Sequence, residues 1–119
     1  MTRLITRLLL LVCCFGLSQT GMADSRETEA WQLIEQNALV IDVRTTEEYA
    51  NAHLPGALHI PYQEIAARFA QLEIRKDREV VLYCRSGNRS GIAYKILIEQ
   101  DYTQLHNGGG LNALLQARP

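Results

Sequence analysis

The distribution of apolar residues along the chain predicts short strands that alternate with helices. Residues 39–43 and 80–83 form two nearly continuous apolar runs, a pattern typical of strands buried on both faces of a parallel sheet. Residues 57–60 give a shorter strand, and residues 102–107 give a further strand at an edge of the sheet. Gly108, Gly109 and Gly110 follow, and we expect them to end that last strand.

Helix signals fill the intervals between these runs. Ser25 can cap a first helix that extends to about Gln36. Thr45 and Glu48 have the spacing of a capping box and predict a short helix over residues 46–51. Further helices are expected over residues 62–71, 91–100 and from residue 111 onward. The two longer ones should turn these residues toward the core: Ile65, Phe69 and Leu72, then Ile92, Ala93, Ile96 and Leu97.

Strands alternating with helices indicate right-handed crossovers and a mainly parallel sheet covered by helices on both faces. The fold class predicted from the sequence is therefore α/β. We see no internal repeat and no second domain boundary, so one small domain is expected.

The first 23 residues have the pattern of a secretory signal peptide. Arg3 and Arg7 precede ten apolar residues at positions 8–17, and Gly21 and Ala23 are the small residues of a cleavage site. A run of ten is shorter than the roughly 20 residues that cross a bilayer. Cleavage would leave a periplasmic domain over residues 24–119 with no stable membrane span. An uncleaved anchor and lipid attachment at Cys13 or Cys14 are the alternatives.

Removing residues 1–23 changes the charge and the cysteine content. Two of the 12 Lys+Arg residues are lost, so ten remain against 13 Asp+Glu, a net charge of −3. This mild acidic excess argues against nucleic acid as a partner. Two of the three cysteines are also lost, which leaves Cys84. A single cysteine in an exported domain is either a reactive thiol or an intermolecular disulfide partner.

The segment after the strand at residues 80–83 carries the candidate chemistry. It consists of Cys84, Arg85, Ser86, Gly87, Asn88, Arg89 and Ser90, and it opens the next helix. Backbone N–H groups in such a loop can turn inward as an anion nest, and the helix N-terminus and two arginines add positive charge. We therefore predict that Cys84 is a nucleophile at the carboxyl end of a strand, where ligand sites lie in open α/β sheets.

The surroundings of Cys84 should favour the thiolate. A thiol pKa of about 8.5 leaves roughly 3% ionised at pH 7, whereas a pKa of about 6.5 gives roughly 75%. Ser86 and Ser90 could donate hydrogen bonds to the anion, and Gly87 permits a positive φ in the loop. A core cysteine at a strand end is the alternative, but it would not require this polar loop.

Other polar residues have less specific interpretations. Arg44 leaves the end of the strand at residues 39–43 and could also bind substrate. Asp42 and Glu48 are interpreted as structural partners of Arg44 or of nearby backbone. The three histidines lie far apart in the sequence, with no second cysteine beside Cys84, so we predict neither a metal site nor a cofactor.

Several motifs together resemble the single-domain rhodanese family. They occur in the family's order over about residues 28–117 and comprise Ile41-Asp42-Val43-Arg44, Glu48-Tyr49, His53-Leu54-Pro55-Gly56-Ala57, His59-Ile60-Pro61, the Cys84–Ser90 loop and Asn107-x-Gly109-Gly110. The resemblance implies a rhodanese-like sheet of five strands. No clear strand precedes Trp31 here, so we expect four or five. Leu114 stands where the family often has tryptophan, which puts the packing of the C-terminal helix in question.

The resemblance also implies an activity. In this family a cysteine accepts a sulfane sulfur from thiosulfate as a persulfide, and cyanide or a thiol removes it. By position, Cys84 would carry the persulfide, the N–H groups of Arg85 through Ser90 would cradle it, and Arg85 and Arg89 would meet the anionic donor.

Two alternatives to this thiosulfate sulfurtransferase stay open. The first is a persulfide carrier with little turnover, for which a thioredoxin-like protein is a candidate partner. The second is a cysteine phosphatase or arsenate reductase. Those enzymes use a Cys-x5-Arg loop, whereas the spacing from Cys84 to Arg89 is Cys-x4-Arg, a smaller cradle that suits a single sulfur.

Overall fold

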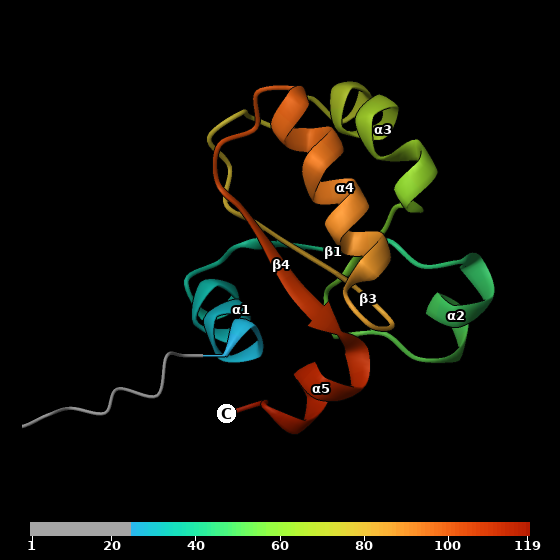
Figure 1. The fold of residues 1–119 in the computed structure, drawn as a ribbon, viewed down its shortest axis with the longest axis vertical. Coiled ribbons are helices and arrows are strands. Elements are labelled where there is room, and N and C mark those ends of the chain that lie inside the picture. The colour runs from blue at the N-terminus through green and yellow to red at the C-terminus, as the bar shows by residue number, and fades with distance from the viewer. Residues whose placement is uncertain (1–24) are drawn as a thin grey trace, which may run out of the picture.

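A computed structural model describes residues 25–119 of the chain as an α/β domain (Figure 1). The predicted signal peptide lies outside the described residues and stays a prediction. In chain order the elements are α1 (Arg26–Glu35), β1 (Leu39–Asp42), α2 (Thr46–Asn51), β2 (Leu58–His59), the 3₁₀ turn η1 (Tyr62–Glu64), α3 (Ile65–Gln71), β3 (Val80–Cys84), α4 (Asn88–Glu99), β4 (Leu105–Gly110) and α5 (Leu111–Gln116).

The sheet has four parallel strands in the order β2-β1-β3-β4. Helices α1 and α5 cover one face, and α3 and α4 cover the other (Figure 1). This confirms the predicted fold class, and the described residues form four strands, as allowed by the prediction of four or five. Because β1 and β3 are the central strands, their side chains are buried on both faces, as their apolar runs indicated.

The predicted helix caps are confirmed. Ser25 Oγ accepts the N–H of Thr28, and Thr45 and Glu48 form a complete capping box at the start of α2. Helix α4, however, begins at Asn88 rather than at residue 91, because Gly87 takes a left-handed conformation that turns the chain directly from the loop into the helix. The loop after Cys84 is therefore only three residues long.

From the sequence we expected the glycine run to end the last strand, but it does not. Strand β4 continues through Gly110, with a bulge that places one extra residue, Gly108, opposite the junction of Leu82 and Tyr83. A Cβ on Gly108 would lie only 3.1 Å from the Val81 side chain. Gly109 has φ +92°. Close packing at Gly108 and the positive φ of Gly109 thus favour glycine at the bulge in this strand.

Two of the predicted core residues are wrong. Leu72 is 49% exposed and Ile92 is 40% exposed, because α3 ends at Gln71 and α4 turns a different stripe inward. The buried residues of α4 are Ser90, Ala93 and Leu97.

The C-terminal helix packs against the core although Leu114 replaces the family's frequent tryptophan. Leu114 is fully buried, and Trp31 Nε1 donates to its carbonyl oxygen at 2.7 Å.

None of the helices formed by residues 25–119 has the length and apolar character needed to cross a bilayer.

Candidate active site

Strand β3 ends at Cys84, and the loop of Arg85, Ser86 and Gly87 joins it to the N-terminus of α4. The strand is fully buried, so it carries Cys84 to the edge of the core, where the side chain has an exposure of 0%. Gly87 has φ +96°, a conformation that favours glycine. This turn bends the loop back over the sulfur.

Two donor groups lie within hydrogen-bonding distance of the sulfur of Cys84. The N–H of Gly87 lies 3.0 Å from Sγ, and Ser90 Oγ lies 3.5 Å from it. Burial raises the pKa of the Cys84 thiol, but hydrogen bonds from the Ser90 hydroxyl and from the N–H groups of Ser90, Ser86 and Gly87 lower it more, so the pKa lies below its ordinary value. Three of the predicted cradle amides therefore act on the sulfur.

The two loop arginines have different surroundings. The Arg85 side chain is exposed and makes no hydrogen bond or ion pair with any residue of the described chain. Arg89 instead forms a two-bond pair with Glu48, at 2.6 and 2.9 Å. The hydrogen bond from Arg89 is the main reason that the pKa of Glu48 falls to about 2. The resemblance implies that both arginines meet the anionic donor, whereas in the structure Arg89 is paired with Glu48 of α2.

Arg44 is almost completely buried against the carboxylate of Asp42. Its Nε and Nη2 atoms donate to Asp42 at 2.7–3.1 Å, and Nη2 also donates to the carbonyl oxygen of Ala52. The predicted pairing of Asp42 with Arg44 is confirmed. Glu48, for which we expected Arg44 or nearby backbone as partner, accepts the backbone N–H of Thr45 and pairs with Arg89 rather than with Arg44.

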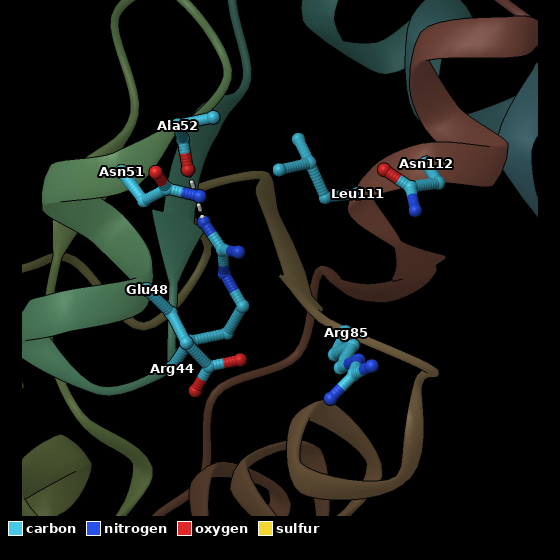
Figure 2. A pocket seen from close by; sticks show the side chains of 7 residues that line it. All are labelled: Arg44, Glu48, Asn51, Ala52, Arg85, Leu111 and Asn112. Carbon is cyan, nitrogen blue, oxygen red and sulfur yellow. Dashed lines mark hydrogen bonds between the residues drawn. The ribbon is translucent and has the colours of Figure 1, made fainter.

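A hollow of about 260 Å³ lies beside the loop. Figure 2 shows Arg44 and the α2 side of this hollow facing Arg85 and the start of α5 across it. Its lining residues are Arg44, Glu48, Asn51, Ala52, Arg85, Leu111 and Asn112. Arg85 and Arg44 thus share one small polar space next to the loop that holds the thiol, which suits a small anion.

Three residues that we did not assign to the site contact the backbone of the active-site loop. Asn107 Nδ2 donates to the carbonyl oxygen of Gly87 at 2.9 Å, and Arg26 Nη2 donates to that of Ser86 at 3.0 Å. A Cβ on Gly110 would lie 2.2 Å from the Arg85 carbonyl oxygen, so only glycine fits there. The Asn-x-Gly-Gly motif signalled two of these residues, but no sequence pattern identified Arg26.

The histidines near this end of the sheet have structural partners. His59 Nε2 lies 2.7 Å from the carbonyl oxygen of Arg44, and His53 Nδ1 lies 2.7 Å from that of Tyr49. Both rings stack on the Tyr49 ring. Within residues 25–119, no group of three or more His, Cys, Asp or Glu side chains is placed to hold a metal ion.

Comparison with known proteins gives a consistent family. Residues 27–117 match the rhodanese-like domain. The chain is 44% identical over 71 residues to the thiosulfate sulfurtransferase PspE of Escherichia coli, covering 60% of this chain and 68% of that protein. It is 43% identical over 79 residues to a sulfurtransferase of Allochromatium vinosum, covering 66% and 72%. A solved structure titled "rhodanese with anions from E. coli" matches with a TM-score of 0.63 and 40% identity, covering 69% of this chain and 94% of that one.

Proposed function

This chain belongs to the rhodanese-like domain family, and we propose that it is a thiosulfate sulfurtransferase that uses Cys84 as a persulfide carrier. Its relatives carry sulfurtransferase names, which supports sulfur transfer in general. One observation in this chain supports the finer assignment. The sulfur of Cys84 is fully buried, yet it receives the Gly87 N–H at 3.0 Å and has a lowered pKa.

The first half-reaction is a nucleophilic displacement at sulfur. The Cys84 thiolate attacks the outer sulfur of thiosulfate, a Cys84–S bond forms, and the S–S bond of thiosulfate breaks. Sulfite leaves with the electron pair, so no general acid is required. Arg85 lines the hollow and has no ion partner among the described residues, which supports a role for it in binding the entering anion.

The second half-reaction returns the free thiolate. Cyanide or a thiolate attacks the outer sulfur of the persulfide, and the S–S bond breaks with its electron pair on Cys84. The loop stabilises negative charge on the persulfide through preorganised N–H donors. A thioredoxin-like protein is a candidate acceptor, since its reactive thiolate could attack the outer sulfur of the persulfide. We also propose that the signal peptide exports the domain to the periplasm.

A persulfide carrier with little turnover is the second candidate function. The complete burial of Cys84 favours it, because donor and acceptor must reach a sulfur that the loop covers. The phosphatase hypothesis has less support. A phosphatase of this kind needs an arginine that binds an oxyanion within the loop, whereas Arg89 is paired with Glu48.

Intact mass spectrometry of the mature domain after exposure to thiosulfate tests the proposal. We expect a gain of one sulfur atom that cyanide removes, and no gain in C84S. A steady-state thiosulfate:cyanide assay then separates the two candidates, since loading without turnover favours the carrier. Sulfur transfer that persists in C84S would exclude Cys84 as the nucleophile.

A further inference from the structure

Asn107 in β4 makes three hydrogen bonds around the active-site loop. Its Nδ2 donates to the carbonyl oxygen of Gly87 at 2.9 Å. Its Oδ1 accepts the N–H of Gly109 at 3.1 Å and the hydroxyl of Ser90 at 2.7 Å. The side chain therefore bridges the bulge in β4 to both the loop and the first turn of α4.

These partners fix the orientation of the Asn107 amide. The Gly87 carbonyl oxygen can only accept, so the nitrogen must face it, and the Gly109 N–H can only donate, so the oxygen must face it. A flipped amide would oppose like groups at both positions. With Oδ1 so placed, the short 2.7 Å contact requires Ser90 to be the donor.

The same Ser90 hydroxyl is also the side-chain donor closest to the Cys84 sulfur, at 3.5 Å. A serine hydroxyl has one hydrogen, so it cannot make full hydrogen bonds to Asn107 Oδ1 and Cys84 Sγ at the same time. The two distances indicate that the hydroxyl points to Asn107 Oδ1 in the resting arrangement, and negative charge on Sγ would turn it toward the sulfur.

Resting on the proposed function of the loop, we propose that Asn107 is a positioning residue that competes with the sulfur of Cys84 for the hydroxyl proton of Ser90. When Cys84 is a thiol, the hydroxyl donates to Asn107. When the sulfur is negatively charged, the hydroxyl turns to Sγ and Asn107 keeps its bonds to Gly87 and Gly109. The proton stays on Ser90 oxygen throughout, and only its direction changes.

Other charges also act on the sulfur and must stay constant in a test. Arg89 of α4 interacts electrostatically with Cys84. Other charged groups near the active-site loop are Arg85 in the loop itself, the buried Asp42–Arg44 pair at the end of β1, Glu48 of α2 and Arg26 of α1. A comparison confined to positions 90 and 107 leaves all of these groups in place.

A double-mutant cycle of N107A, S90A and the double variant tests the proposal. The readout is the pH midpoint of thiolate formation at Cys84, followed by thiolate absorbance and by the rate of alkylation with iodoacetamide. Since N107A also removes the brace on Gly87, its effect in the S90A background measures that structural contribution alone. We expect N107A to lower the midpoint by about one pH unit more in the presence of Ser90 than in its absence, as one competing hydrogen bond would. S90T, which keeps the hydroxyl, should retain this difference.

Equal effects of N107A in the two backgrounds would overturn the proposal. A second measurement does not depend on the folding of N107A. In the native domain, the NMR signals of the Asn107 side-chain amide should shift with the same midpoint as Cys84, and this shift should be strongly reduced in S90A. An equal shift in S90A would also overturn it. Failure of the native domain to take up sulfur from thiosulfate would contradict the proposed function instead, because neither readout above involves sulfur transfer.

Discussion

Glu48 holds the guanidinium of Arg89 through both carboxylate oxygens, with donor–acceptor distances of 2.6 and 2.9 Å. The pair ties α2 to the first turn of α4 beside the active-site loop. Because Glu48 also lines the hollow next to Arg85, its negative charge both neutralises Arg89 and faces the space where an anion would enter.

Replacing Glu48 should therefore strengthen binding of an anionic donor. We expect E48Q to lower the KM for thiosulfate about threefold, equivalent to about 0.6 kcal/mol, through removal of one partly screened charge. Steady-state kinetics at low ionic strength measures this, and added salt should reduce the difference. E47Q removes the same charge from an exposed position on α2 and should leave KM unchanged. Equal KM values in E48Q and the native domain would contradict the predicted role.

The thiol of Cys84 should ionise at lower pH in the folded domain than in the unfolded chain. Its folded pKa is lowered because the loop hydrogen bonds outweigh burial. The thiolate therefore stabilises the fold at pH values above the unfolded pKa, and this contribution is lost as the pH falls through the folded pKa. Thiolate absorbance as a function of pH, with and without urea, gives the two midpoints. A folded midpoint equal to or above the unfolded one would refute the prediction.

The buried pair of Asp42 and Arg44 should matter far more to stability than an exposed pair. D42N leaves the buried Arg44 charge without its counter-charge, so we expect a loss of about 3 kcal/mol in the free energy of unfolding. D77N breaks the pair between Asp77 and Arg75, whose side chains are 64% and 79% exposed, respectively. This change should alter the free energy of unfolding by less than about 0.5 kcal/mol. Urea unfolding followed by the fluorescence of Trp31, the one tryptophan of the chain, compares them.

A methyl group at Gly110 should displace the loop. In G110A the new Cβ would meet the Arg85 carbonyl oxygen, and we expect a loss of about 1–3 kcal/mol in stability, typical of overpacking, together with a large fall in sulfur transfer. G91A is the matched control, because its Cβ would make an ordinary 3.5 Å contact with Asn107. Since Gly91 lies inside α4, that change should stabilise the domain by about 0.5–1 kcal/mol. If G110A were as stable and active as G91A, the close approach would not constrain the site.

Much of the secondary structure could be predicted because its causes are local. The capping box of Thr45 and Glu48 predicted α2 over residues 46–51, and the structure has it there. The buried strands β1 and β3 followed from their apolar runs. The glycine run at 108–110 predicts a strand end, but these residues lie inside β4. Its role depends on Val81 and on the Arg85 carbonyl oxygen, which are distant in sequence.

The α/β class, the order of the elements and the position of one cysteine at the end of a buried strand can be predicted from the sequence, since periodicity, caps and strand runs act over a few residues. The pairing of the polar groups depends on the folded arrangement of the elements. Glu48 binds Arg89 rather than Arg44, and Asn107 and Arg26 support the loop from β4 and α1. Such pairings depend on which segments the sheet order brings together, and a partner 20 or 60 residues away leaves no periodic pattern in the chain.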